Sequence, residues 1–169
     1  GARELCVVVL TGTVSVTVDG QTHSHLGQRH SVFENVSPAA VYVPAGKTVV
    51  ILAERDAEVG LCSAPAGEAA REVRVIDPAT MRRSERGSGS NTRYICDILP
   101  HDDPTANHLL VVEVITPAGH SSSYPPHKHD MEQPPVETQL EETYYHRLNP
   151  PQGFAFQRVY TDDRSLDEA

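Results

Sequence analysis

The chain has 169 residues and a formal net charge of −9 at pH 7, which suits one domain or two small ones with a packed core. The acidic balance argues against a nucleic-acid-binding function, because phosphate contacts need clustered Lys and Arg side chains. Aromatic residues make up 5% of the sequence, Trp is absent, and 11 Gly and 13 Pro interrupt it. This composition favours short strands joined by turns over long helices.

No apolar run approaches the roughly twenty residues that a membrane-spanning helix needs, and the N-terminus lacks the pattern of a signal peptide. The three cysteines, Cys6, Cys62 and Cys96, are widely spaced, and each lies within an apolar run. Such thiols are typical of buried residues in a reducing compartment rather than of disulfides or metal ligands. We therefore expect a cytoplasmic protein with no membrane partner.

The first third of the chain is predicted to form a series of short strands. Residues 5–10 are a continuous apolar run, typical of a strand buried on both faces. Residues 14–18 alternate Val with Ser and Thr, as a half-buried strand does, and the Asp19-Gly20 pair that follows is a hairpin signal. Turn signals about every ten residues indicate a sandwich or a small barrel. Further strands are expected over residues 32–34, 40–43, 48–53 and 58–62.

Polar residues with histidines follow the hairpin. His23 and His25 form a His-x-His pair, but no Glu-led strand follows at a suitable spacing. We therefore favour loop or strand histidines over a metal site at this pair. Arg29 and His30 are candidates for surface or interface groups, and the sequence does not decide their place.

Residues 64–93 are rich in small and charged side chains, with a basic and Gly/Ser-rich run over residues 82–91. This composition favours a flexible, solvated connection between two units. The alternative is that the basic run binds an anion. Residues 72–76 are a candidate strand that leads to the second unit.

The strand pattern resumes at residue 94. Residues 94–99 are predicted to form a strand that Pro100 ends, and residues 101–104 a turn. Residues 109–115 follow as an apolar strand that carries a lone acidic residue, Glu113. Helical periodicity is nearly absent, so we expect an all-β fold.

The histidines His127 and His129 are the first part of a candidate metal site. They lie two residues apart, so their side chains leave the same face of an extended strand. Imidazole and carboxylate ligands suit zinc, or iron and manganese in mixed sites. In the run over residues 140–146, Glu142 is the favoured third ligand, and Glu141 is the alternative if the strand slips by one. A polar strand that faces solvent is the remaining alternative.

Three blocks of sequence around this site resemble one known family: SSYPPHKHD (122–130), LEETYYHR (140–147) and GFAFQRVYTDD (153–163). They are similar to the 5-deoxy-glucuronate isomerases of bacterial inositol catabolism, which are related to the uronate ketol-isomerases. Residues 4–10, 32–34, 41–44 and 62–66 resemble the same family. The resemblance implies a bicupin of two jelly-roll β-barrels, with residues 1–66 in the first, 67–93 as the connection and 94–169 in the metal-binding second barrel.

The resemblance also implies a divalent metal, usually zinc, with His127, His129 and Glu142 as ligands. Iron and manganese are alternatives. Family members begin before the position of Gly1 and continue past that of Ala169, through a strand that supplies a fourth ligand, a histidine. We therefore expect both barrels to be incomplete in this chain, and the metal to be weakly held or absent. Barrel edges left open in this way would favour a homo-oligomer.

The reaction that the resemblance implies is the aldose–ketose isomerisation of 5-deoxy-D-glucuronate, a uronate-type sugar acid, to 5-dehydro-2-deoxy-D-gluconate. Tyr144 and His146 share the face of Glu142 and are candidates for proton transfer, with a structural role as the alternative. Arg158 is the candidate partner of the substrate carboxylate, and Gln157 replaces it if the strand faces the other way. A metal-mediated hydride shift is the rival route. The alternative functions are a non-catalytic sugar-binding or regulatory cupin domain and another metal-dependent cupin enzyme, such as a dioxygenase.

Overall fold

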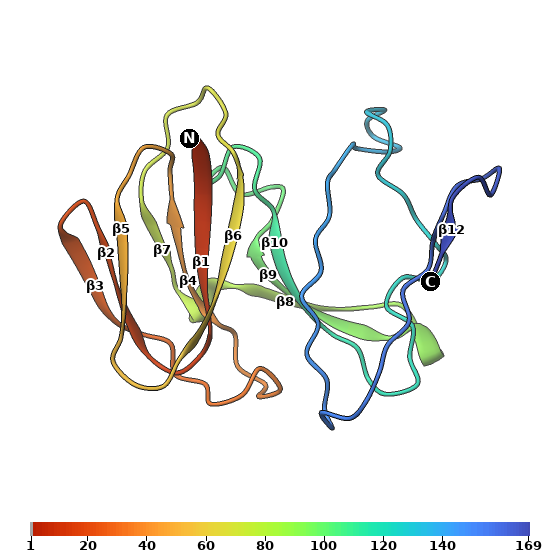
Figure 1. Cartoon of the computed structure of the whole chain (residues 1–169), viewed down its shortest axis with the longest axis horizontal. Coiled ribbons are helices and arrows are strands. Elements are labelled where there is room, and N and C mark those ends of the chain that lie inside the picture. The colour runs from red at the N-terminus through yellow and green to blue at the C-terminus, as the bar shows by residue number, and fades with distance from the viewer. Residues whose placement is uncertain (1) are drawn as a thin grey trace. The chain divides into compact units, whose positions relative to one another are not determined.

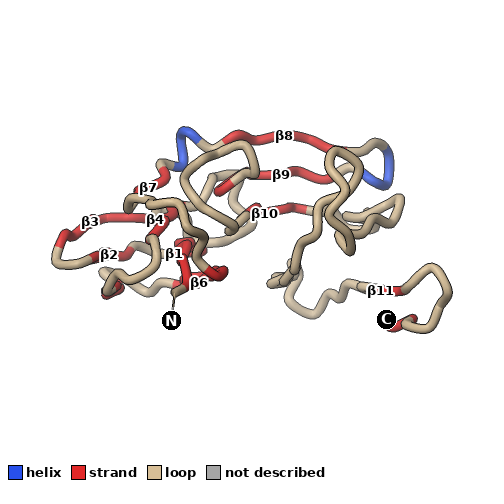
Figure 2. Tube along the Cα trace, turned by 90° about the horizontal axis from the view of Figure 1, so that it is seen from above, coloured by secondary structure: helices blue, strands red, loops and turns tan. Residues whose placement is uncertain are grey.

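The computed structural model of the protein describes residues 2–169, and Gly1 lies outside the described residues. The chain forms two compact units, residues 1–127 and residues 128–169. Strands make up nearly all of the regular structure. The helices among the described residues are two single 3-10 turns, η1 (Pro78–Thr80) and η2 (Gly89–Asn91), which Figure 2 draws in blue. The predicted all-β class is confirmed.

The first unit contains three antiparallel sheets (Figure 1). Their strand orders are β6-β1-β4-β7, β3-β2-β5 and β10-β9-β8, and none of them closes on itself within the described residues. The first sheet comprises β1 (Arg3–Thr11), β4 (Ala39–Val43), β6 (Glu58–Pro65) and β7 (Arg74–Ile76). The second comprises β2 (Val14–Val18), β3 (Gln21–Leu26) and β5 (Val49–Ala53), and the third β8 (Arg82–Arg86), β9 (Arg93–Leu99) and β10 (Val111–Ile115).

Strand β1 is buried on both faces, as its apolar run predicts. Val7 and Val9 point into one core cluster together with the valines of β2 and β4. Cys6 and Val8, on the other face, pack into a second cluster with residues of β9 such as Ile98. Full burial of one such side chain contributes about 1.5–3 kcal/mol to the free energy of folding. Because its two faces pack into different core clusters, β1 connects the three sheets of the first unit.

Two stretches of the first unit differ from the prediction. Residues 32–34 form turns and bends instead of a strand, because the Glu34 carboxylate accepts hydrogen bonds from the backbone N–H groups of His30 and Ser31. Residues 82–86, predicted as part of a flexible connection, form β8 and pair with β9. The polar side chains of β8 are stabilised from outside the strand, since the Arg82 guanidinium donates to Asp97 at 2.7 Å.

The second unit contains one short antiparallel pair, β11 (Val159–Tyr160) and β12 (Asp167–Glu168). Residues 140–146, predicted as a strand, have no ladder partner among the described residues and are not a strand. Their backbone hydrogen bonds are not taken up by a sheet, which a strand requires. No helix in the described part of the chain has the length and hydropathy to cross a membrane.

Candidate metal centre

Three of the predicted site residues meet in space. His127, His129 and Glu142 each offer one ligand atom, and these atoms all lie within 4.8 Å of one another. A tetrahedral zinc ion with bonds of about 2.1 Å separates its ligand atoms by roughly 3.4 Å. The three side chains therefore fit a divalent ion after a small inward adjustment, and their two nitrogens and one carboxylate oxygen suit zinc, iron or manganese. That they bind a metal stays a prediction.

The ring of His129 is oriented by the backbone. Its Nδ1 lies 2.9 Å from the carbonyl oxygen of Thr138. A carbonyl accepts only from a protonated ring nitrogen, so this contact selects the tautomer whose lone pair is on Nε2. Hydrogen bonds of this type fix the ring and raise the basicity of metal-binding histidines.

The structure brings Glu142 into the cluster and leaves Glu141 outside it. Tyr144 and His146 lie next along the chain, and their rings stack with centroids 6.0 Å apart and an interplanar angle of 9°. Burial raises the pKa of the Tyr144 hydroxyl, and its contact with the negative Glu142 carboxylate raises that pKa further. Tyr144 is therefore protonated at neutral pH and is a hydrogen-bond donor. The catalytic roles of Tyr144 and His146 stay predictions.

Arg158 already has a carboxylate partner in the chain. Its Nε and Nη2 donate to the two oxygens of Asp167 at 2.6 and 2.7 Å, and its guanidinium lies 5.6 Å from the ring centre of Tyr160. Phe154 and Phe156 are 79% and 86% exposed, and the alternate residues Ala155 and Gln157 are exposed as well, so neither face of this segment is buried. Arg158 and Gln157 as partners of a substrate carboxylate stay predictions.

The second histidine pair lies on β3. His25 is exposed, and its Nδ1 lies 2.7 Å from the Glu54 carboxylate. Hydrogen bonds from the Ser15 hydroxyl and from the backbone and ring of His25 lower the pKa of Glu54 to about 2. His25 therefore connects β3 to Glu54, the residue that follows β5, through this contact.

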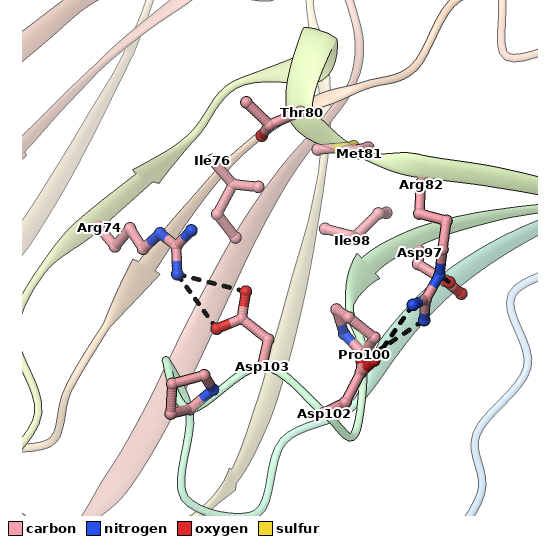
Figure 3. Close-up of a pocket in the computed structure, with 11 residues that line it drawn as sticks. Arg74, Ile76, Thr80, Met81, Arg82, Asp97, Ile98, Pro100, Asp102 and Asp103 are labelled. Atoms are coloured by element: carbon pink, nitrogen blue, oxygen red, sulfur yellow. Dashed lines mark hydrogen bonds and ion pairs between the residues drawn. The ribbon is translucent and has the colours of Figure 1, made fainter.

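A polar cavity of about 400 Å³ lies beside β7, η1 and β9 (Figure 3). Its charged side chains are matched with one another: Arg74 lies 3.1 Å from Asp103, and Arg82 contacts both Asp97 and Asp102. The basic run that contains Arg82 was the alternative anion site in the sequence. Its arginine in this cavity is instead neutralised by carboxylates.

The structure decides the place of one charged residue that the sequence left open. Arg29, a candidate for a surface or interface group, is 1% exposed and donates to both oxygens of Glu113. It also donates to the backbone carbonyls of Leu10 and Val36. The lone Glu113 in an otherwise apolar strand was the signal that a buried cation had to lie opposite it.

These observations define an all-β protein with a candidate centre of two histidines and one glutamate. The chain belongs to the KduI/IolB family, whose sequence pattern matches residues 1–169, and the predicted resemblance is confirmed. It is 51% identical over 166 residues to the 5-deoxy-glucuronate isomerase of Halalkalibacterium halodurans, a match that covers 98% of this chain and 61% of the relative. The 5-deoxy-glucuronate isomerase of Bacillus subtilis strain 168 is 49% identical with the same coverage.

A solved structure extends the likeness to the fold. The crystal structure of an IolB-like protein from Salmonella typhimurium LT2 matches with a TM-score of 0.94 and 49% identity, over 99% of this chain and 63% of that one. The chain thus spans about three fifths of the length of the curated relatives that it matches.

Proposed function

We propose that the protein is a 5-deoxy-glucuronate isomerase that converts 5-deoxy-D-glucuronate to 5-dehydro-2-deoxy-D-gluconate. The observation that carries the proposal is the cluster of His127, His129 and Glu142. It occurs in a chain that is about half identical to proteins named for this activity. An aldose–ketose isomerisation needs a site that binds two adjacent substrate oxygens, and a cluster of this composition suits that requirement.

We propose a divalent ion, zinc in the first place, held by the two imidazoles and the carboxylate. When bound, such an ion polarises the carbonyl and hydroxyl oxygens of the substrate as a Lewis acid. Iron and manganese are the alternatives that this ligand set also accepts.

The protein's own side chains would then handle the proton. Tyr144 keeps its hydroxyl proton at neutral pH, which suits donation of a hydrogen bond to a substrate oxygen on which negative charge develops. His146 is stacked beside it, and a neutral imidazole suits removal of the carbon-bound proton and its return to the neighbouring carbon. Arg158 would bind the substrate carboxylate if that carboxylate displaced Asp167 from the guanidinium. Gln157 is the alternative partner of the substrate carboxylate.

We further propose that the chain forms parts of two cupin barrels, residues 1–66 and residues 94–169, with residues 67–93 as the connection. We also propose that the enzyme works in the cytoplasm. The thiols of Cys6, Cys62 and Cys96 are all free, which supports a reducing compartment. A homo-oligomer is part of the proposal, because strand edges that remain open favour pairing between copies.

The test is an isomerase assay of the purified protein with 5-deoxy-D-glucuronate, before and after treatment with a chelator. We expect activity that chelation abolishes and that added Zn²⁺ restores, and loss of activity in His129→Ala. Activity that is unaffected by both chelation and His129→Ala would overturn the proposal. The same assay in deuterated water separates the two routes, since proton transfer through His146 places solvent deuterium in the product and a hydride shift does not.

A further inference from the structure

We propose that Glu137 is a positioning residue for the metal centre, because its carboxylate holds the loop of residues 130–139 in the shape that orients His129. The inference rests on the proposed function, since it concerns the same centre. The loop separates the second candidate ligand from the third, so its shape decides how far apart the two ligands lie.

The loop is closed at its neck on His129 itself. The backbone carbonyl of His129 accepts a hydrogen bond from the N–H of Leu140 at 3.1 Å. Its ring Nδ1 contacts the carbonyl of Thr138 at 2.9 Å. Both the main chain and the ring of His129 are therefore tied to the returning arm of the loop, a few residues before Glu142.

Glu137 holds the loop together from inside. Its Oε1 accepts hydrogen bonds from the backbone N–H groups of Asp130 and Met131 at 2.7 and 2.9 Å. Its Oε2 lies 3.4 Å from the Lys128 ammonium, and the side chain is 10% exposed. Two backbone hydrogen bonds between Glu137 and Gln133, of 2.8 and 3.1 Å, fix the main chain at the same point.

The two sets of contacts are joined by a single peptide unit. Glu137 precedes Thr138, whose carbonyl orients the His129 ring. Hydrogen bonds from the backbone of Met131 and Asp130 and the contact with Lys128 lower the pKa of Glu137, so its carboxylate is ionised at neutral pH. Its removal leaves two amides without their acceptor, and the returning arm loses the support that places the Thr138 carbonyl. The metal would then have to order the His129 ring as it binds, and the entropy cost of this ordering weakens metal binding.

The experiment measures the affinity of the metal-free protein for Co²⁺, followed by its visible absorption, and for Zn²⁺ by competition. We expect Glu137→Ala to weaken both by about ten- to a hundredfold, the usual effect of removing a group that supports a metal ligand. Glu137→Gln keeps an oxygen that can accept from the amides, so we expect an intermediate affinity. The matched control is Glu141→Gln, a neighbouring carboxylate outside the cluster, which we expect to bind like the wild type.

A second readout needs no metal. Amide hydrogen exchange at Asp130, Met131 and Leu140 should speed up in Glu137→Ala, while the thermal unfolding midpoint of the first unit stays unchanged. If Glu137→Ala does not fold, Glu137→Gln is judged by the same two measurements.

The outcomes separate the two proposals. If the wild type binds neither ion, or if His129→Ala binds as well as the wild type, the metal centre of the proposed function fails. If binding depends on His129 but Glu137→Ala matches the wild type, the inference about Glu137 is wrong and the proposed function stands. Weakened binding with unchanged exchange at Asp130 and Met131 also overturns the inference, because the loop would then not be what changed.

Discussion

Arg29 and Glu113 lie 84 residues apart in the sequence, and their side chains form a bidentate ion pair with N–O distances of 2.9 and 2.6 Å. The guanidinium is 1% exposed and the carboxylate 20%. The pair connects the segment after β3 to β10, so it ties the N-terminal sheets to the third sheet of the first unit. A buried cation of this kind depends on its partner, since desolvation is offset only while the pair is intact.

Substitution of Glu113 should therefore destabilise the protein more than loss of an exposed pair does. We expect Glu113→Ala to lower the free energy of unfolding by about 3 kcal/mol, at the low end for a broken buried pair because the carboxylate is partly exposed. The control is Lys47→Met, which breaks the exposed pair with Asp19, and we expect less than about 1 kcal/mol there. Urea unfolding followed by circular dichroism measures both. Equal losses in the free energy of unfolding would show that the buried pair stabilises the protein no more than the exposed pair does.

The contacts of Glu54 predict a specific pH dependence. Its pKa is about 2 in the folded protein against an ordinary value of 4.5. Because the folded value is the lower one, the ionised carboxylate contributes stability above pH 4.5, and this contribution is lost as the pH falls towards 2. The stability difference between the wild type and Glu54→Gln should therefore shrink across this range. Ser15→Ala, which removes the strongest of these hydrogen bonds, should shift the loss to higher pH. A difference that stays constant from pH 4.5 downward would contradict the assignment.

The sequence predicted those strands whose own residues show a pattern of buried and exposed faces. The apolar run of β1 and the alternation of β2 report directly which faces are buried, because side chains on a strand alternate between faces. Strand β8 was missed since its residues are polar and its support comes from pairing with β9. Residues 140–146 have a strand pattern, but a strand also needs a hydrogen-bonding neighbour, and none lies beside them within the described residues.

The candidate site also has a part that the sequence predicts and a part that it does not. Parity along an expected strand favoured Glu142 over Glu141, and the structure brings Glu142 to the two histidines. Neither residues 127–129 nor residues 140–146 form a strand, however, so the position of Glu142 does not follow from strand parity. The loop of residues 130–139 was not predictable, because it depends on contacts such as Glu137 with the Asp130 amide. Such contacts have no periodic signature. The place of Arg29 could not be decided from the sequence for a related reason, since its burial depends on Glu113, which lies far away in the sequence.

The three thiols should differ in reactivity in an order set by burial. Cys6 and Cys62 are opposite each other in the β1–β6 register, and burial raises the pKa of both. Cys6 is fully buried and Cys62 only partly. A thiol reacts as its thiolate, so we expect an alkylating reagent to modify Cys62 slowly in the native protein. Cys6 and the buried Cys96 should react only after unfolding in urea. Peptide mass mapping gives the order, and modification of Cys6 as fast as Cys62 would contradict it.

Tyr144 offers the sharpest test of the chemistry at the proposed centre. Its hydroxyl contacts Glu142 and stays protonated at neutral pH, so Tyr144→Phe removes a hydrogen-bond donor while it keeps the ring that stacks on His146. We expect kcat to fall by about a hundredfold or more, as for loss of a positioned donor, with Co²⁺ affinity unchanged. The matched control is Tyr145→Phe, which removes the hydroxyl of the adjacent ring, where Arg147 donates its hydrogen bond, and should keep full activity. If Tyr144→Phe lost metal affinity in proportion to activity, the hydroxyl would act on the ligand Glu142 and not on the substrate.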